Sequence, residues 1–391
     1  MSLCGKRILF FVPHENATTG GVFASQVLGL AQYCTKLGAK SLIFHAAEGE
    51  SREIVVRDDG VSLLSMGERK VKTTVFNVVK YVQEIVHRYW RELAEFKPTH
   101  IYTRNYAMSV GVSELVKATG ARLVYSMRGP DVYERTRSGK IRDYIAGFFI
   151  GRMVRQAVKK CDVFTSMTQV AVNWIETKYG KKGVAFPCCV RNLFFEIKRN
   201  DYRTLMRNRL GFHDTDKVIA WCGNVAAWQC LRDVVLLVKK MTECDSNIRV
   251  LFLSDPVNPI EDLCDRLEFS QEYWRAFRVL PDEVPAYLCA CDVGLDVLAV
   301  DDFKSSICCP IKVGEYLAVG LPVLITRTMG DMPELVKRFE VGKLLRDDLD
   351  PHDTLTKLND LLGRDVEVIR SAARTFFSWE ANDENVKAVF N

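Results

Sequence analysis

The 391-residue chain lacks any apolar run long enough to cross a membrane. Its longest uncharged apolar stretches are Ile8–Pro13, Ile145–Gly151 and Leu288–Cys291, far below the roughly 20 residues of a spanning helix. Before Pro13 the N-terminus offers only a short apolar segment, too short for the core of a signal peptide. We therefore expect a cytoplasmic protein, and peripheral contact with the inner face of the membrane is kept as a further hypothesis.

Metal-binding patterns are also missing. The sequence has 13 cysteines, an odd number, but no Cys-x-x-Cys, and the adjacent pairs Cys188-Cys189 and Cys308-Cys309 do not have zinc-finger spacing. The six histidines do not cluster in the sequence. We expect reduced cysteines, no metal and no cofactor.

Two nucleotide-binding signatures, Gly-x-Gly-x-x-Gly and the P-loop, do not occur, so neither a dinucleotide site nor a Walker site is predicted. Neither a fixed-period repeat nor a low-complexity segment is visible, which argues against a solenoid. The sequence contains no recognisable nucleic-acid module, and no nucleic acid is expected as a partner.

What the chain does contain is an alternation of short β-branched runs with longer amphipathic segments. This alternation predicts an α/β protein whose parallel sheets are covered on both faces. The expected strands are Arg7–Val12, Ser41–Phe44, Ile101–Thr103, Arg122–Ser126, Val163–Ser166, Val184–Phe186, Val218–Cys222, Ile248–Leu253, Arg278–Leu280, Val293–Val297 and Pro322–Ile325. Eleven strands are too many for one typical open sheet, so we expect two Rossmann-like domains, 1–192 and 193 onward, joined near the polar stretch Arg191–Asp201.

Charge divides the chain in the same place. Residues 1–190 have 28 basic and 16 acidic side chains, a net charge of +12, while residues 191–391 have 26 and 33, a net charge of −7. The basic half favours an anionic partner, such as a phosphate-bearing ligand or anionic lipid. The alternative is an ordinary lysine-rich solvated face.

Two segments of the basic half have apolar residues at helical spacing next to basic ones, Val75–Phe96 and Lys140–Lys160. We expect both to be helices that pack their apolar side on a sheet, because a parallel sheet must be covered on both faces. The alternative for both is contact with an anionic membrane.

The first candidate ligand loop ends in Gly20-Gly21 and precedes the expected helix Val22–Lys36. Glycine lets backbone amides come close to a ligand, and the start of a helix favours negative charge, so the loop would suit a diphosphate. A simple tight turn is the alternative.

The most informative segment runs from Ser305 to Thr326. Pro310 suits the first turn of a short helix and Gly320 its C-terminal exit. Lys312 and Glu315 then lie one turn apart on the same side of the helix. A carboxylate there can accept both hydroxyls of a ribose, and a lysine in the first turn can meet a phosphate. The alternative is a surface Lys–Glu pair.

This segment resembles the nucleotide-sugar-binding domain of GT-B glycosyltransferases of the large retaining class called family 4, through the pattern Pro-x-Lys-x-x-Glu-Tyr-Leu-Ala-x-Gly-x-Pro-Val. Further matching pieces follow in the family's order over nearly the whole chain. They are Gly20-Gly21, Cys161–Thr168, Phe186-Pro187, Phe194-Phe195, Leu280–Leu288, Cys291–Val293, Val341–Leu344 and Phe377–Glu380.

The resemblance implies a retaining, metal-independent transfer of a sugar from a nucleotide-diphosphate sugar to a glycan or lipid-phosphate-linked acceptor, as in polysaccharide or glycolipid assembly. Two Rossmann-like domains would face a central cleft. Residues 1–192 would hold the acceptor, residues 193–372 the donor, and a helix within 373–391 would return to the first domain.

On the resemblance, the expected catalytic residues are Arg128, Lys312 and Glu315. The expected donor-binding residues are Gly20, Gly21, Gly223, Asn224, Arg232, Leu280, Lys304, Pro310, Lys312 and Glu315. Arg128 would clamp a phosphate, or instead form a structural ion pair with Asp131.

The chain departs from the family's pattern at several places, two of which bear directly on donor binding. Ile307 stands where many relatives have a first glutamate, and the loop Gly223–Gln229 has no cation before Arg232. Charge for the diphosphate would then come from Arg232, Lys304 or Lys312. These departures keep two alternatives open, a non-catalytic scaffold that has lost donor contacts and a nucleotide-sugar epimerase. The adjacent Asp301-Asp302 is interpreted as loop charge.

Overall fold

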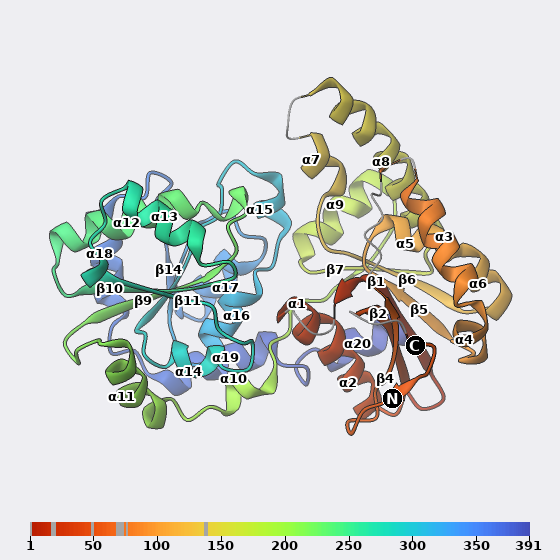
Figure 1. Cartoon of the computed structure of the whole chain (residues 1–391), viewed down its shortest axis with the longest axis horizontal. Helices are drawn as coiled ribbons and strands as arrows, with labels where there is room; N and C mark the ends of the chain where they lie inside the picture. Colours follow the sequence, from red (N-terminus) through yellow and green to blue (C-terminus); the bar gives the residue numbers. More distant parts are fainter. Residues whose placement is uncertain (1, 17–20, 48–50, 68–73, 76, 137–139) are drawn as a thin grey trace. The chain divides into compact units, whose positions relative to one another are not determined.

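The computed structural model describes residues 2–16, 21–47, 51–67, 74–75, 77–136 and 140–391 (Figure 1). The chain forms two compact units. The first comprises Met1–Pro187 together with Asn382–Asn391, and the second comprises Cys188–Ala381. Each unit is described by itself.

The first unit is built on one sheet with the strand order β3-β4-β2-β1-β5-β6-β7-β8. All neighbouring strands are parallel except β3 and β4, which are antiparallel. The strands are β1 (Arg7–Asn16), β2 (Lys40–Ala47), β3 (Val55–Val56), β4 (Ser62–Gly67), β5 (His100–Thr103), β6 (Arg122–Met127), β7 (Val163–Ser166) and β8 (Val184–Ala185).

Helices follow most strands of this sheet, as parallel connections require. They are α1 (Gly21–Phe23), the π-helical turn η1 (Ala24–Leu28), α2 (Gly29–Lys36), α3 (Val78–Arg88), α4 (Trp90–Glu95), α5 (Tyr106–Gly111), α6 (Ser113–Thr119), α7 (Asp131–Thr136), α8 (Ile141–Lys160), α9 (Gln169–Tyr179) and α20 (Asp383–Phe390). The expected helix Val22–Lys36 is thus present as three consecutive helical pieces. α3 and α4 bury Val82, Ile85 and Leu93, so the two helices found within the expected segment Val75–Phe96 pack inward as expected.

The second unit has an entirely parallel sheet with the order β11-β10-β9-β12-β13-β14. Its strands are β9 (Lys217–Gly223), β10 (Ile248–Ser254), β11 (Trp274–Phe277), β12 (Val293–Asp296), β13 (Val323–Ile325) and β14 (Gly342–Leu344). Its helices are α10 (Asn192–Glu196), α11 (Arg199–Leu210), the 3-10 turn η2 (Ala227–Gln229), α12 (Leu231–Cys244), α13 (Asn258–Arg266), the 3-10 turn η3 (Gln271–Tyr273), α14 (Val284–Leu288), α15 (Phe303–Ile307), α16 (Ile311–Ala318), α17 (Met332–Arg338), α18 (Pro351–Leu361) and α19 (Val366–Phe377). Figure 1 shows α12 and α13 on one side of this sheet and α14 and α19 on the other.

The core of the second unit lies between this sheet and its helices. Trp221 and Phe252, from the adjacent strands β9 and β10, are fully buried with ring centroids 5.9 Å apart. β-Branched and aromatic side chains on central strands meet covering helices on both faces, which explains the near-continuous apolar strand sequences.

One expected strand was wrong. The segment Arg278–Leu280 lies outside the sheet, and the strand next to β10 is instead β11, paired from Trp274 to Phe277. β3, β4 and β14 were missed, because β3 and β14 have only two and three residues and β4 carries two serines.

The end of the chain is shared between the units. α19 packs on α16 in the second unit, and the chain joins the first unit from Asn382 onward. There the ring of Phe390 in α20 lies 6.2 Å from both Phe10 and Tyr102, and α20 lies in blue among the first unit's elements in Figure 1. The observed border at 187/188 and return at 382 compare with the expected positions 192/193 and 373.

Candidate functional site

The strand order of the second sheet places a ligand site by topology. Counting from β9, the order is 3-2-1-4-5-6, so the chain direction across the sheet reverses between β9 and β12. Ligands of such open sheets bind beyond the carboxyl ends of the strands at this switch point. Here the strands end in Gly223 and Asp296, and α16 begins with the first turn that carries Lys312.

A buried cation connects the two strand ends. Nζ of Lys312 lies 3.0 Å from Oδ1 of Asp296 and donates a hydrogen bond to Oε1 of Gln229, also at 3.0 Å. The side chains of Lys312 and Asp296 are 8% and 0% exposed. Burial raises the pKa of Asp296, and the positive charge of Lys312 opposes this rise. Lys312 is therefore not the partner in a surface Lys–Glu pair, and its role toward a donor phosphate stays a prediction.

Glu315 lies one turn further along α16 and is partly exposed. Within the described part of the chain, no hydrogen bond or ion pair reaches its carboxylate. Burial raises the pKa of Glu315 to about 7, against the opposing effects of Arg191 and Lys312. A carboxylate with unused acceptor sites at the switch point is suited to accept ligand hydroxyls.

Contacts behind these side chains fix the position of α16. The hydroxyl of Tyr316 accepts a hydrogen bond from the backbone N–H of Cys222 in β9, at 2.6 Å. A Cβ at Gly294 in β12 would lie 2.3 Å from the ring of Tyr316, so only glycine permits this packing. The helix that carries Lys312 and Glu315 is thus held against both central strands.

The loop after β9 has its own internal contacts. A Cβ at Gly223 would lie 2.2 Å from Oε1 of Gln229, so the glycine makes room for that side chain. Asn224 accepts a hydrogen bond from the backbone of Ala226 at 3.0 Å, which closes a turn. The ammonium of Lys304 lies 4.6 Å from the ring centroid of Trp228 in the same loop. The structure thus brings Lys304 to the loop that has no cation of its own.

Three further expected donor residues belong to the same unit. Arg232 is exposed in the first turn of α12, Leu280 is 70% exposed after β11, and Pro310 is buried immediately before the first residue of α16. Ile307, at the position of the family's first glutamate, is buried at 1% exposure. The interpretation of Asp302 as loop charge was wrong, because Asp302 is buried and accepts the backbone N–H of Lys304 as the N-cap of α15.

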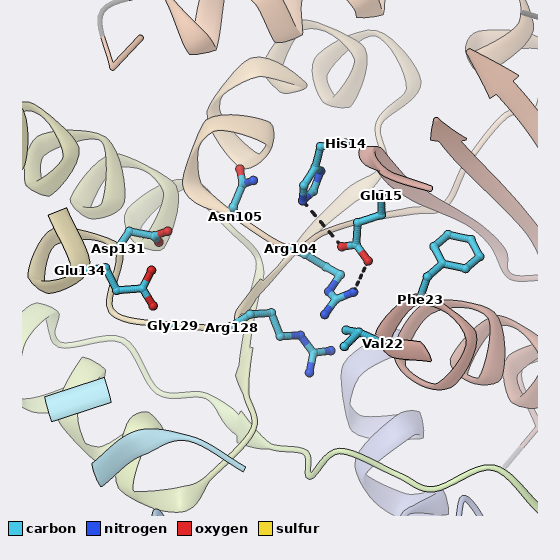
Figure 2. A pocket seen from close by; sticks show the side chains of 10 residues that line it. All are labelled: His14, Glu15, Val22, Phe23, Arg104, Asn105, Arg128, Gly129, Asp131 and Glu134. Carbon is cyan, nitrogen blue, oxygen red and sulfur yellow. Dashed lines mark hydrogen bonds and ion pairs between the residues drawn. The ribbon is translucent and has the colours of Figure 1, made fainter. Parts of the chain in front are cut away.

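The first unit has a cavity at the equivalent position of its sheet. Its order also reverses direction, between β1 and β5, and a cavity of about 490 Å³ lies beyond the ends of β1, β5 and β6. Figure 2 shows the side chains around it. They are His14, Glu15, Val22, Phe23, Arg104, Asn105, Arg128, Gly129, Asp131 and Glu134.

Two arginines face this cavity from adjacent strand ends. Arg104 donates from Nη1 to Oε2 of Glu15, and the pair is largely buried (Figure 2). Arg128 donates from Nη2 to the hydroxyl of Tyr102 at 2.6 Å. Asp131, whose ion pair with Arg128 was the alternative, lines the same cavity. The phosphate-clamp role of Arg128 stays a prediction.

The glycine loop is only partly described. Gly20 lies outside the described residues, and Gly21 is the first residue of α1. The next two residues, Val22 and Phe23, line the first-unit cavity. The roles of both glycines toward a diphosphate stay predictions.

All thirteen cysteines are free thiols, as expected. Among the residues that the structure describes, no group of three or more His, Cys, Asp or Glu side chains is arranged to hold a metal ion. The same part of the chain contains no helix with the length and apolar character that a membrane span needs.

Sequence reasoning missed three residues of the second-unit site, Asp296, Gln229 and Arg191. Asp296 ends an otherwise apolar strand at its carboxyl end, a signal that was available in the sequence. Nothing in the sequence marks Gln229 or Arg191 as neighbours of α16, because both come from loops distant along the chain. Arg191 is held by Asp282 and, at 2.6 Å, by the carbonyl of Pro281.

Comparison with known proteins gives structural matches only. No family model and no curated sequence matches the chain. The solved structure of sucrose-phosphate synthase from Thermosynechococcus elongatus matches with a TM-score of 0.72 at 12% identity, over 99% of this chain and 95% of that one.

Two further matches are WaaG, titled a glycosyltransferase involved in lipopolysaccharide biosynthesis, and Anabaena Alr3699/HepE in complex with UDP and glucose. WaaG has a TM-score of 0.70 at 13% identity, over 98% of this chain and 99% of that one. HepE has a TM-score of 0.68 at 14% identity, over 98% of both chains. At such low identity, these matches establish the fold.

Proposed function

We propose that this chain, which has the GT-B fold of two Rossmann-like domains, is a glycosyltransferase that uses a nucleotide-diphosphate sugar. It would transfer the sugar with retention and without a metal to a glycan or lipid-phosphate-linked acceptor. The observation that carries this proposal is the partly exposed carboxylate of Glu315 at the switch point of the second sheet, which has no hydrogen-bond or ion-pair partner among the residues that the structure describes.

In this proposal the second unit binds the donor. The ionised carboxylate of Glu315 accepts hydrogen bonds from both ribose hydroxyls, because it has acceptor sites and no competing donor within the described residues. Lys304, next to the loop Gly223–Gln229, and Arg232, in the first turn of α12, supply positive charge for the diphosphate. Lys312 acts mainly by connecting Gln229, the last residue of this loop, to Asp296.

The first unit would bind the acceptor in its cavity of about 490 Å³. Arg104 and Arg128 offer guanidinium groups, which bind phosphate or carboxylate in a planar fork. Asp131 and Glu134 line the same cavity and offer acceptors for sugar hydroxyls. This mixture suits a polar acceptor that carries hydroxyl groups as well as an anionic group.

The first experiment is a donor screen that measures slow hydrolysis of nucleotide sugars by the whole chain. UDP-glucose is the natural starting point, because HepE has been solved with it. We expect one donor to be hydrolysed, with loss of activity in Glu315→Ala and no loss in Val368→Ser, an exposed position on α19. Retained activity with the productive donor in folded Glu315→Ala would contradict the proposal.

A second candidate, the non-catalytic scaffold, is favoured by two observations. Ile307 is buried where the family has its first glutamate, and the ammonium of Lys312 is already neutralised by Asp296. Isothermal titration with UDP, ADP and GDP separates the two functions, since a scaffold that has lost its donor contacts should bind none of them.

The basic first unit extends the proposal to location. A cytoplasmic protein that contacts an anionic membrane surface peripherally would meet a lipid-linked acceptor there. The sequence supports this with the net charge of +12 in residues 1–190.

A further inference from the structure

In the first half of helix α8, large apolar side chains are exposed, and an acidic residue and small residues are buried. Ile141, Tyr144, Ile145 and Phe148 are exposed by 80%, 58%, 52% and 64%. They follow the i, i+3, i+4, i+7 spacing, so they share one face of the helix. A helix that simply covers a sheet would have buried them, and the expectation that Lys140–Lys160 packs its apolar side inward was therefore wrong for this half.

The opposite face of the same turns is occupied by small and polar residues. Asp143 is buried and forms an ion pair with Arg135 of α7, with 2.9 Å between Oδ1 and Nη2. A Cβ at Gly147 would lie 2.5 Å from Cγ2 of Thr136, so α7 and α8 pack in close contact here. Figure 1 shows α7 and the first turns of α8 side by side. The inner face is filled by α7, which leaves the apolar face directed outward.

The second half of α8 adds charge of one sign to this exposed surface. Its exposed charged residues are Arg152, Arg155, Lys159 and Lys160, and all four are basic. Arg142 in the first turn is also exposed, while Asp143, the single acid in the helix, is buried and paired. The surface therefore combines apolar side chains at one end with exposed basic side chains along its length.

We propose that α8 is a docking surface for an anionic lipid bilayer, with Ile141, Tyr144, Ile145 and Phe148 inserted among the lipids. Amphipathic helices that lie in a membrane interface combine aromatic and aliphatic residues with lysine and arginine in this way. An acidic protein partner would match the basic side chains of α8. Acidity alone would not account for the four large apolar side chains that are exposed on the same helix. This proposal deepens the proposed function by placing the acceptor domain at a membrane, yet it concerns α8 alone.

The test is co-sedimentation of the full chain with vesicles of phosphatidylglycerol or of phosphatidylcholine. We expect binding to phosphatidylglycerol vesicles that weakens at least tenfold between low salt and 0.5 M salt, because salt screens surface charges. Phosphatidylcholine vesicles should bind at least tenfold more weakly. A full-length protein that stays in the supernatant with phosphatidylglycerol at low salt overturns the proposal.

Two matched variant pairs test the residues. Ile145→Ser with Phe148→Ser should lower the vesicle partition coefficient at least tenfold, whereas Leu205→Ser with Val368→Ser, both 60% exposed in the second unit, should not. Arg152→Glu with Arg155→Glu should have the same effect, whereas Lys240→Glu with Lys337→Glu should leave binding within about twofold. Equal loss in the α8 variants and their controls contradicts a specific surface.

Two further measurements distinguish membrane docking from self-association of the chain, and separate this proposal from the proposed glycosyl transfer. If the chain is a dimer without lipid, and Ile145→Ser with Phe148→Ser makes it a monomer, the face binds a second copy and the membrane proposal fails. Donor hydrolysis in solution should be unchanged in every α8 variant, because α8 contributes no residue to the proposed donor site. Failure of vesicle binding with intact hydrolysis would reject the docking surface and leave the proposed function standing.

Discussion

Lys312 and Asp296 form a buried ion pair, with Nζ and Oδ1 3.0 Å apart and both side chains almost inaccessible to water. The pair joins the first turn of α16 to the carboxyl end of β12. Through Gln229, the same ammonium reaches the loop after β9. One cation thus connects the three segments that meet at the switch point of the second sheet.

The first prediction concerns this pair. Lys312→Met should lower the free energy of unfolding by about 3–5 kcal/mol, because it leaves the carboxylate of Asp296 buried without a partner. The loss should be smaller at pH 5 than at pH 8, since a buried carboxyl with a raised pKa takes up a proton more easily at low pH. Urea unfolding at both pH values measures the difference.

Two controls make this prediction specific. Lys337→Met, at an exposed position of α17, should change stability by no more than about 0.5 kcal/mol. The double variant Lys312→Met with Asp296→Leu should recover most of the loss, because it removes both charges together. A loss below about 1 kcal/mol in Lys312→Met would show that the pair is not buried as described.

The second prediction concerns Glu315 and the donor. Glu315→Ala should weaken binding of the donor nucleotide by about 1.5–3 kcal/mol, or about 10- to 150-fold, the range for hydrogen bonds to a charged group. Glu315→Gln should lose less, because the amide keeps one oxygen acceptor. Titration calorimetry with the nucleoside diphosphate measures the change, and unaltered affinity in folded Glu315→Ala would remove Glu315 from the site.

The third prediction concerns pH. Burial raises the pKa of Glu315 to about 7, so the carboxylate is about one tenth ionised at pH 6 and mostly ionised at pH 8. Because the ionised form is the better acceptor, the donor KM should fall by up to about tenfold as the pH rises from 6 to 8. Glu315→Gln should show a flat profile, and an equal slope in the variant would assign the titration to another group.

The same raised pKa has a consequence for stability. The unfolded chain releases this proton near pH 4.5 and the folded chain near pH 7, so the contribution of Glu315 to stability falls as the pH rises between these values. At pH 8 the variant Glu315→Gln should therefore be more stable than the parent, by about 1–3 kcal/mol. The gain should vanish at pH 4, where the protonated Glu315 side chain is as uncharged as the glutamine that replaces it. Thermal unfolding at the two pH values tests this.

The fourth prediction concerns Lys304 and the diphosphate. Lys304→Met should weaken binding of the nucleoside diphosphate several-fold and reduce its salt dependence, because it removes a positive charge next to the loop after β9. Lys240→Met, exposed on α12, is the charge-matched control and should leave the affinity unchanged. If both variants lose affinity equally, general charge rather than Lys304 attracts the ligand.

Individual strands and site residues show how much of the structure local sequence patterns could predict. Val163–Ser166 was predicted residue for residue, because its β-branched and aromatic side chains favour a strand, and three of its four residues are buried. The strand expected at Arg278–Leu280 lies instead at Trp274–Phe277, since its pairing with Val250–Leu253 and not its own composition decides where it lies. In the second-unit site, Lys312 and Glu315 could be predicted from their helical spacing. The neighbours Asp296, Gln229 and Arg191 could not, because they come from separate segments of the chain, the end of β12, the turn η2 and the residue before α10.

By itself, the sequence determined the α/β class, the presence of two largely parallel sheets and the segment Pro310–Glu315, since periodicity and turn residues act over short distances along the chain. Only the tertiary structure decided which charged side chains are paired and buried, and which helix faces are covered by other elements. Lys312 is neutralised by a strand end 16 residues before it, and the apolar face of α8 stays exposed because α7 fills its inner side. Burial and pairing depend on what other elements bring to the same place, and helical periodicity does not contain that information.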